Sequence, residues 1–408
     1  MRRTALVIAG ALLLTACGGG GGSAADSGKV VFWDTSGPNE HPVFDQLAKD
    51  CAGKGGYTVD VQQVSFDQAL ANYKTAAQGG QGPDVLRSEV AWVAQLAQNG
   101  LITDLTDTDL AKDTSDFLDG PLGSTKYNGK TYAVPQVTDT LALLYNKKLL
   151  ADAGVQPPTS WDELKADAPK LGGPKAIFLN NDAYYALPFI YGAGGDLLDV
   201  ANKKIVVNSA QNVQALETAK GLLDAKAATT ALDQANSYNN MKAAFSAGQV
   251  AMEIDGPWTV VDLLKGDAFK DPANLGVALL PGKDSGPVGG HDYVVRQGTK
   301  AKTSAQKFIQ CMSSTESQVT VSKKLGLLPT RKSAYDSPDV KSQPTVAAFE
   351  PAIKQTHPRP WVPAGAQLFD QLKIDYAYVL SGQKDAKTAL DEVAKAYKDQ
   401  VVPDYTVG

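Results

Sequence analysis

The chain has 408 residues, of which 44 are acidic and 39 are Lys or Arg, so its formal net charge is −5. A mildly acidic composition argues against a nucleic-acid-binding protein and against a basic membrane-binding face. The length predicts two domains.

The first residues, MRRTALVIAGALLLTAC, place two arginines before an apolar run at 5–16. This run is shorter than the ~20 residues that span a bilayer, so residues 1–16 are predicted to be a signal peptide. LTAC, ending at Cys17, resembles the lipobox of bacterial lipoproteins. That resemblance implies lipidation of Cys17 and an exported protein anchored to the outer face of the cell membrane, with residues 17–28 as a Gly-rich tether; ordinary secretion is the alternative.

From residue 29 onward, predicted strands and helices alternate. Strands are predicted at 29–35, 57–65 and 83–88, and helices at 41–54, 66–78 and 90–100. In the first helix, Phe44, Leu47, Ala48 and Cys51 share one apolar face. This alternation predicts an α/β fold with a parallel sheet covered on both faces.

A second α/β region is predicted to begin near Leu141. Strands are predicted at 140–146, 176–180, 250–255 and 275–282, and helices at 160–171, 211–225, 241–249, 368–380 and 388–401. Ser160 and Glu163 have the spacing of a capping box at a helix start.

Two cysteines remain if Cys17 carries lipid. In an exported protein Cys51 and Cys311 can form a disulfide that closes a loop of about 260 residues. Two buried free thiols are the alternative.

Motifs for covalent or metal chemistry are absent from the sequence. The three histidines are isolated, and no HExxH, GxSxG or P-loop occurs. We therefore expect no metal, no cofactor and no enzyme activity. A glycosidase needs only two carboxylates, so a secreted carbohydrate-active enzyme remains a remote alternative.

Three stretches, GPDVLRSEVAW, YAVPQVTDTLALLYNKKLL and FSAGQVAMEIDGPWTV, resemble the extracellular solute-binding proteins of sugar ABC importers. The chain is most similar to the maltose and maltodextrin branch. The resemblance implies a type II periplasmic-binding-protein-like fold, in which two α/β lobes joined by a hinge close on ligand in a cleft. It also implies an N-terminal lobe of 29–138 plus 291–332 and a C-terminal lobe of 139–290 plus 333–408.

The resemblance implies aromatic platforms for sugar rings. Trp258 follows a Gly-Pro turn where relatives stack a tryptophan on a sugar ring, although core packing is the ordinary role of a tryptophan. Tyr184 matches a stacking tyrosine, with Tyr185 as the alternative. Asp182 beside it would accept hydrogen bonds from hydroxyls.

Charged side chains at the family's positions would bind sugar hydroxyls. Asp139 lies where relatives carry a ligand-binding carboxylate in the hinge. Arg87 and Glu89 follow a strand end, and the sequence leaves open which of them contacts ligand. Asn39 and Glu40 are candidates in the loop after the first strand.

The remaining candidates depart from the family pattern. His291 follows a glycine pair where several relatives have Trp, which implies a changed or smaller platform. Arg359 and Trp361, between prolines in HPRPWVP, could edge the cleft, and Phe369 is an alternative platform to Trp361.

The leading hypothesis is a monomeric lipoprotein that delivers a maltose- or maltodextrin-type oligosaccharide to the transmembrane subunits of an ABC permease. The alternative is the same fold binding trehalose, another oligosaccharide or a polyol phosphate. A phosphate ligand would require a site rich in Arg and Lys.

Overall fold

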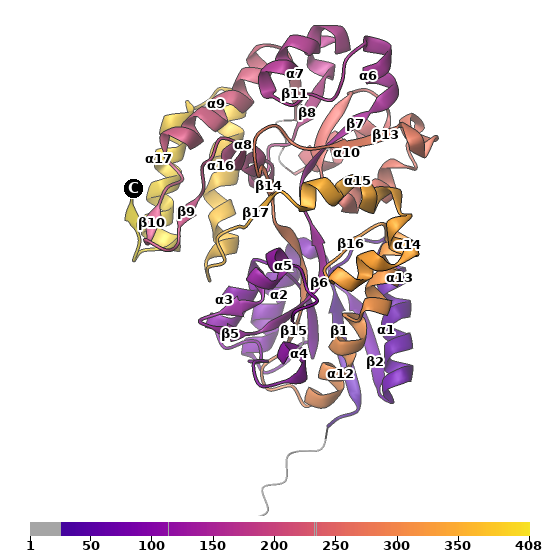
Figure 1. Cartoon of the computed structure of the whole chain (residues 1–408). Helices are drawn as coiled ribbons and strands as arrows, with labels where there is room; N and C mark the ends of the chain where they lie inside the picture. The colour runs from indigo at the N-terminus through magenta and orange to yellow at the C-terminus, as the bar shows by residue number, and fades with distance from the viewer. Residues whose placement is uncertain (1–25, 113, 232, 234) are drawn as a thin grey trace, which may run out of the picture.

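The computed structural model describes residues 26–112, 114–231, 233 and 235–408. The predicted signal peptide 1–16, Cys17 and most of the tether 17–28 lie outside these residues. The described chain forms two α/β lobes, one built mainly from the N-terminal part and one mainly from later residues (Figure 1). Among the described residues, no helix has the length and apolar character that crossing a membrane demands.

The N-terminal lobe is built on a six-stranded sheet of order β16-β6-β15-β3-β1-β2. Its strands are β1 (Lys29–Asp34), β2 (Thr58–Gln63), β3 (Val85–Glu89), β6 (Ala133–Asp139), β15 (Gly289–Val295) and β16 (Leu328–Pro329), with a separate hairpin of β4 (Lys126–Tyr127) and β5 (Lys130–Thr131). Its helices are α1 (His41–Gly55), α2 (Phe66–Gln78), α3 (Trp92–Gln98), α4 (Asp109–Lys112), α5 (Asp119–Ser124), α12 (Lys302–Met312) and α13 (Thr315–Leu325).

The C-terminal lobe is built on a five-stranded sheet of order β11-β8-β12-β7-β13. These strands are β7 (Ala142–Asn146), β8 (Ile177–Leu179), β11 (Ala228–Thr230), β12 (Met252–Asp255) and β13 (Leu275–Ala278). Two small sheets join β9 (Leu198–Asp199), β10 (Lys204–Ile205) and β18 (Thr406–Val407), and β14 (Gly286–Pro287) with β17 (Thr356–His357).

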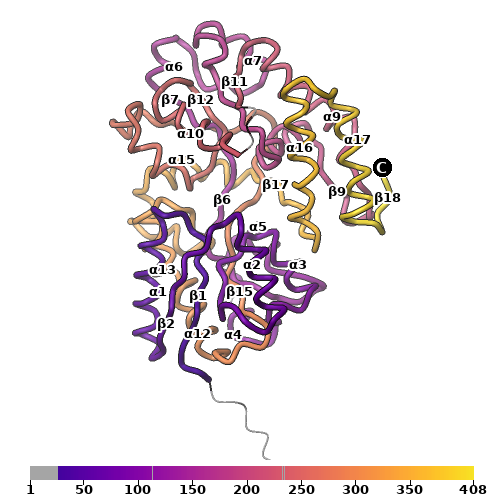
Figure 2. The backbone as a smooth tube through the Cα atoms, turned by 180° about the vertical axis from the view of Figure 1, so that it is seen from behind, coloured from indigo at the N-terminus to yellow at the C-terminus, as the bar shows by residue number. Residues whose placement is uncertain are grey.

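Helices after β7 surround this second sheet. They are α6 (Lys147–Ala153), α7 (Trp161–Asp167), α8 (Leu187–Gly192), α9 (Ala210–Asp224), α10 (Ser237–Ser246), α11 (Val260–Leu263), α14 (Pro338–Lys341), α15 (Pro344–Ile353), α16 (Leu368–Ser381) and α17 (Ala386–Ala396). Figure 2 shows α16 and α17 side by side on one flank of the lobe, against α9.

Helices cover both faces of the N-terminal sheet. Val85 of β3 belongs to an apolar cluster with α1 and α12, whereas its neighbour Leu86 belongs to a cluster with α2 and α3. This alternation follows from the two-residue period of a strand, and it confirms the predicted two-sided cover.

The sheets are mixed, so the prediction of a parallel sheet is wrong in part. β2, β1 and β3 are parallel, as are β11, β8 and β12, but β15 is antiparallel to both β3 and β6. The cause is the hinge. β6 leaves the first lobe and β15 returns to it beside β6, so the two strands run in opposite directions. The chain crosses again after β16.

The predicted helix at 160–171 divides into two elements. Its N-cap is as expected, because Ser160 Oγ accepts from the Glu163 backbone N–H at 3.1 Å, but the Glu163 carboxylate accepts from the Thr159 N–H rather than from that of Ser160. The α-helix then gives way to a 3₁₀ turn at Ala168–Leu171, where Pro169 has no N–H to donate.

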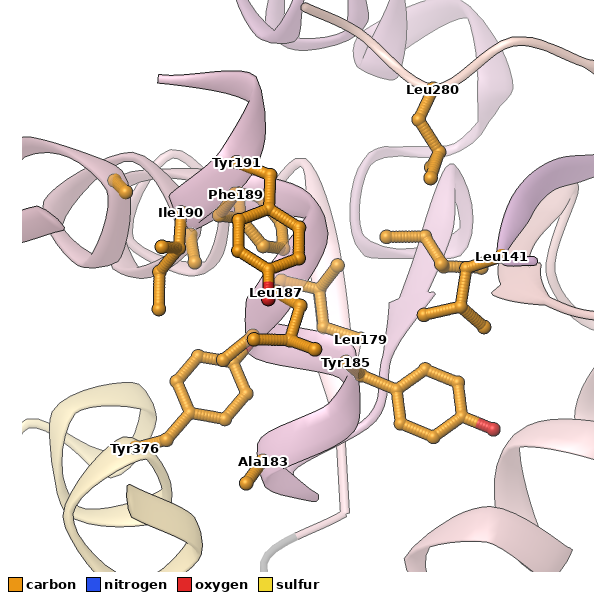
Figure 3. Packing of buried hydrophobic residues seen from close by; sticks show 14 of the residues in the cluster. Leu141, Leu179, Ala183, Tyr185, Leu187, Phe189, Ile190, Tyr191, Leu280 and Tyr376 are labelled. Atoms are coloured by element: carbon orange, nitrogen blue, oxygen red, sulfur yellow. The ribbon is translucent and has the colours of Figure 1, made fainter. Parts of the chain in front are cut away.

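The core of the C-terminal lobe lies beneath the turn that carries the candidate tyrosines. Figure 3 shows Tyr185 and Tyr191 among Leu179, Leu187 and Ile190, all of them buried. Tyr185 is 7% exposed and its hydroxyl donates to Asp255 Oδ1 at 3.3 Å. Tyr185 is therefore a core residue, and its neighbour Tyr184, which is half-buried, is the one left to face the other lobe.

Cys51 and Cys311 are joined by a disulfide, with their Cα atoms 5.8 Å apart. Cys51 is on α1 and Cys311 is on α12, and these helices pack against each other on one face of the N-terminal sheet. The bond connects segments separated by 260 residues, so it ties the first helix to the part of the chain that returns from the other lobe.

The double variant Cys51→Ala/Cys311→Ala is expected to lose about 2–5 kcal/mol of unfolding free energy, because the unfolded chain regains the freedom that the bond removes. Urea unfolding of the oxidised protein and the variant, with and without reductant, measures this. Reductant should destabilise only the natural protein. Equal midpoints for protein and variant under oxidising conditions would show that the bond contributes nothing.

Candidate functional site

The candidate residues gather where the carboxyl ends of parallel strands in the two sheets meet. β3 ends at Glu89, and turns that follow β8 and β12 carry Tyr184 and Trp258. Ligands of open α/β sheets bind outside these strand ends. We call the following six residues the inter-lobe cluster: Glu89, Asp139, Tyr184, Trp258, Arg359 and Trp361.

Arg359 connects the two lobes within this cluster. It is 7% exposed, its Nη2 donates to Glu89 Oε1, and its Nε donates to the Val288 carbonyl at 2.9 Å. The guanidinium lies 5.6 Å from the ring centroid of Tyr184 and 5.4 Å from that of Trp361. Burial between a carboxylate and aromatic rings suits arginine, because its flat guanidinium stacks and is less strongly hydrated than an ammonium group.

Asp139 and Tyr184 approach each other over a hinge glycine. A methyl group on Gly289 would lie 2.0 Å from Asp139 Oδ1 and 2.7 Å from the Tyr184 hydroxyl. A side chain at position 289 would therefore push both groups away. The glycine pair at the start of β15 lets a carboxylate from the hinge and a tyrosine from the second lobe face one point.

Burial controls the ionisation of two acidic candidates. Desolvation raises the pKa of Asp139 to about 7, although the charge of Arg359 acts in the opposite direction. Desolvation also raises the pKa of Glu40, with Arg87 opposing it. A carboxyl group that titrates near neutrality can accept a hydrogen bond when ionised and donate one when protonated.

Trp258 is half-buried and packs against apolar residues of both lobes. Its Nε1 donates to the Tyr238 hydroxyl at 3.1 Å, and its ring centroid is 6.5 Å from that of Tyr184. Tyr238, which sequence reasoning missed, thus fixes the orientation of the indole. The ammonium group of Lys242 in turn lies over the Tyr238 ring, 5.2 Å from its centroid.

Two predicted residues make structural contacts beside the cluster. Arg87 is 3% exposed, and its Nε donates to Gln136 Oε1 at 2.8 Å beneath the cluster, whereas Glu89 pairs with Arg359 within it. Asp182 caps the turn by accepting from the Tyr184 N–H at 3.0 Å and pairs with Lys373 at the same distance. Nothing in the sequence pattern identifies Lys373 as that partner.

Asn39 contacts the opposite lobe rather than the centre of the cluster. Its Nδ2 donates to Asp262 Oδ1 at 2.5 Å, and Asp262 also pairs with Lys242 and Lys265. The two lobes therefore touch at this point as well as at Glu89 and Arg359.

His291 and Phe369 each adjoin a residue of the cluster. His291 is the register partner of Glu89 in the β15–β3 pair. Burial lowers the pKa of His291 well below its ordinary value, and the charges of Arg87 and Arg359 act in the same direction, so the imidazole is neutral. Phe369 lies 6.4 Å from Tyr184 and 6.0 Å from the Arg359 guanidinium, so both Trp361 and Phe369 border Arg359.

Asp292, next to His291, is a buried carboxyl group that sequence reasoning missed. It follows a register shift in β15, is 0% exposed and accepts from Ser124 Oγ at 2.9 Å. Burial raises its pKa to about 8. The folded state therefore holds this proton more tightly than the unfolded chain, whose aspartates titrate near pH ~4.

The stability that this proton contributes is fully present below pH ~4 and is lost as the pH rises toward 8. Asp292→Asn, which stays neutral and can still accept from Ser124, is expected to reduce the fall in melting temperature between pH 6 and pH 9. Scanning calorimetry at both pH values measures this, with the exposed Asp107→Asn as control. An unchanged pH dependence in Asp292→Asn would contradict the assignment.

Among the residues that the structure describes, no three His, Cys, Asp or Glu side chains gather as metal ligands. The cluster thus consists of aromatic rings, carboxyl groups and one guanidinium. Such a surface can stack on flat apolar faces and exchange hydrogen bonds with hydroxyl groups.

Known proteins share both the sequence pattern and the two-lobed fold. The GacH receptor of Streptomyces glaucescens GLA.O, solved without ligand and in complex with acarbose, is 41% identical, covers 92% of this chain and 99% of its own, and superposes with a TM-score of 0.88. The maltotriose-binding protein of Pyrococcus abyssi is 26% identical over 92% of this chain and 82% of its own length. A maltooligosaccharide ABC transporter solute-binding lipoprotein of Streptococcus pneumoniae is 28% identical, over 88% of this chain and 86% of its own length.

The matches extend along nearly the whole chain, which confirms the periplasmic-binding-protein-like fold and the resemblance seen in the sequence. Residues 46–348 match the family described as bacterial extracellular solute-binding protein. The chain, whose two lobes meet at Arg359 and Glu89, therefore belongs to this family of bacterial extracellular solute-binding proteins.

Proposed function

We propose that the protein is the substrate-binding component of an ABC sugar importer. It captures a maltose- or maltodextrin-type α-glucoside by closure of its lobes and delivers it, as a monomer, to the transmembrane subunits of the permease. One observation carries this proposal: a receptor that is 41% identical over 92% of this chain has been solved in complex with acarbose.

The chemistry of the inter-lobe cluster supports a neutral sugar. A pyranose ring presents C–H groups on its faces and hydroxyls around its rim. Tyr184 and Trp258 provide ring faces, while Glu89, Asp139 and Arg359 provide charged partners for hydroxyls.

The same residues argue against an anionic ligand such as a polyol phosphate. Arg359 is already paired with Glu89, and Arg87 donates to Gln136. Asp139 adds another carboxyl group to the site. A phosphate would need unpaired cations at the cluster and would be repelled by these carboxylates.

A thermal-shift panel tests the proposal. Maltose, maltotriose, maltotetraose and acarbose are expected to raise the melting temperature, since a ligand that binds only the folded state stabilises it. Trehalose, another oligosaccharide and a polyol phosphate form the comparison arms. A shift with the phosphate alone would favour the alternative ligand class, and no shift with any saccharide would contradict the sugar assignment.

Incubation of the protein with maltotetraose distinguishes a receptor from a carbohydrate-active enzyme. We expect the tetrasaccharide to be recovered intact after prolonged incubation, as measured by chromatography. Appearance of shorter products, reduced by mutation of the cluster carboxylates, would contradict a receptor function.

We further propose that lipid on Cys17 holds the exported protein at the membrane, with residues 17–28 as its Gly-rich tether. A Gly-rich chain of this length spans roughly 15–20 Å, which keeps the receptor close to its permease. Cys17→Ala is expected to move the protein from the membrane fraction to the soluble fraction, because the acyl chains proposed to anchor it are attached at Cys17. Retention of the variant on membranes would contradict the anchor.

A further inference from the structure

Asn39 and Asp262 make a hydrogen bond between the lobes for which the proposed sugar contacts give no role. Asn39 lies in the turn between β1 and α1 of the N-terminal lobe, and Asp262 lies on α11, which follows β12 of the C-terminal lobe. Asn39 Nδ2 donates to Asp262 Oδ1 at 2.5 Å, although the two residues are separated by 223 positions in the sequence. Because the two groups belong to different lobes, the bond exists only while the lobes are together.

The turn that carries Asn39 is held in place by its own backbone. The Glu40 and His41 N–H groups both donate to the Gly37 carbonyl, at 3.0 and 2.9 Å. Pro38, between that carbonyl and Asn39, has a fixed φ angle. The exposed Asn39 amide is therefore presented from a tight turn rather than from a long free loop.

The Asp262 carboxylate is positioned by two lysines of its own lobe. Lys265 Nζ donates to Oδ1 at 3.1 Å, and Lys242 Nζ donates to Oδ2 at 3.3 Å. The Lys242 ammonium group also lies over the ring of Tyr238, whose hydroxyl accepts from Trp258. The acceptor of the inter-lobe bond is thus connected to the proposed sugar platform. A contact between groups that are already positioned loses little side-chain entropy when it forms.

We infer that Asn39 and Asp262 form a latch between the lobes that stabilises the closed, sugar-bound state. The latch bond joins protein to protein, so it adds to the affinity for a sugar by favouring closure and makes no contact with the ligand. The latch rests on the proposed function and deepens it, because it gives Asn39 a role in retaining the sugar that differs from binding its hydroxyls.

Calorimetric titration of the complete chain in detergent with maltose, maltotriose and maltotetraose tests the latch. Asn39→Ala is expected to weaken binding of all three sugars by the same factor, about two- to tenfold, the range for the loss of one hydrogen bond. Asn39→Asp places two carboxylates opposite each other and should weaken binding further. Adding Asp262→Asn restores an amide opposite a carboxylate and should recover most of that loss. Asn72→Asp, the same change at an exposed asparagine of α2, is the matched control and should leave the affinity unchanged.

Unchanged affinity in Asn39→Asp would overturn the latch and leave the proposed function intact. A loss that Asp262→Asn does not reverse, or one that differs among the three sugars, would also overturn it, because Asn39 would then act on the ligand and not on the other lobe. Failure of the natural protein to bind any of the sugars would instead contradict the proposed function. The two failures are therefore distinguishable within one set of titrations.

Discussion

Replacement of Trp258 by alanine is expected to weaken maltooligosaccharide binding by about 30- to 1000-fold, which corresponds to the loss of about 2–4 kcal/mol for a buried aromatic anchor. The indole packs against both lobes and is held by the hydroxyl of Tyr238. Its removal takes away the proposed sugar platform and part of the apolar surface that joins the lobes. Calorimetric titration with maltotriose measures the change in affinity.

Two further variants separate the platform from its support. Trp258→Phe keeps a ring but cannot donate to Tyr238, so an intermediate loss is expected. Tyr238→Phe removes only the acceptor and should have the smallest effect of the three. An affinity of Trp258→Ala within threefold of the natural value, with an unchanged melting curve, would show that the indole does not contact ligand.

Replacement of Arg359 by alanine is expected to have the largest effect on stability. Arg359 is 7% exposed and is the partner of Glu89, so its loss leaves a partly buried carboxylate that keeps only the N–H of Ala91. Breaking a buried ion pair from one side costs about 3–5 kcal/mol. Urea unfolding at pH 7 measures the loss.

The pH dependence of this variant follows from Asp139. The charge of Arg359 lowers the pKa of Asp139 against the effect of burial, so without Arg359 that pKa rises above about 7. A raised carboxyl pKa stabilises the folded state at low pH and costs stability as the pH rises. The deficit of Arg359→Ala should therefore be larger at pH 8 than at pH 5.

The double variant Arg359→Ala/Glu89→Gln is the matched control, because it also removes the negative charge of Glu89 that Arg359→Ala leaves without its partner. It should recover part of the stability that the single variant loses. A single variant within 1 kcal/mol of the natural protein, or a double variant with additive losses, would contradict the coupling of the two side chains.

Local elements of the fold follow closely from sequence patterns. The helix predicted at 66–78 is α2, with the same bounds, because its apolar spacing is regular and glycines follow it. The helix predicted at 241–249 begins earlier, at Ser237, where a polar stretch carries no apolar period. The insertion of β15 between β3 and β6 depends on pairing between distant segments, which no local pattern reports.

The candidate site shows the same division between local and distant information. Motifs place Tyr184, Asp139 and Trp258 on turns and strand ends, and the structure brings all three to the junction of the lobes. Partners that come from elsewhere in the chain could not be predicted. The Asp262 carboxylate accepts a hydrogen bond from Asn39 of the other lobe. Asp262 lies in the short helix α11, whose sequence gives no sign of this contact.

The central claim is that this receptor binds an α-glucoside between its lobes, and calorimetric titration of the natural protein and Trp258→Ala with maltotriose tests it most directly. The predicted result is saturable binding of one sugar per protein molecule and a loss of about 30-fold or more in the variant. Absence of heat from the natural protein, or equal affinity in both proteins, would contradict the claim.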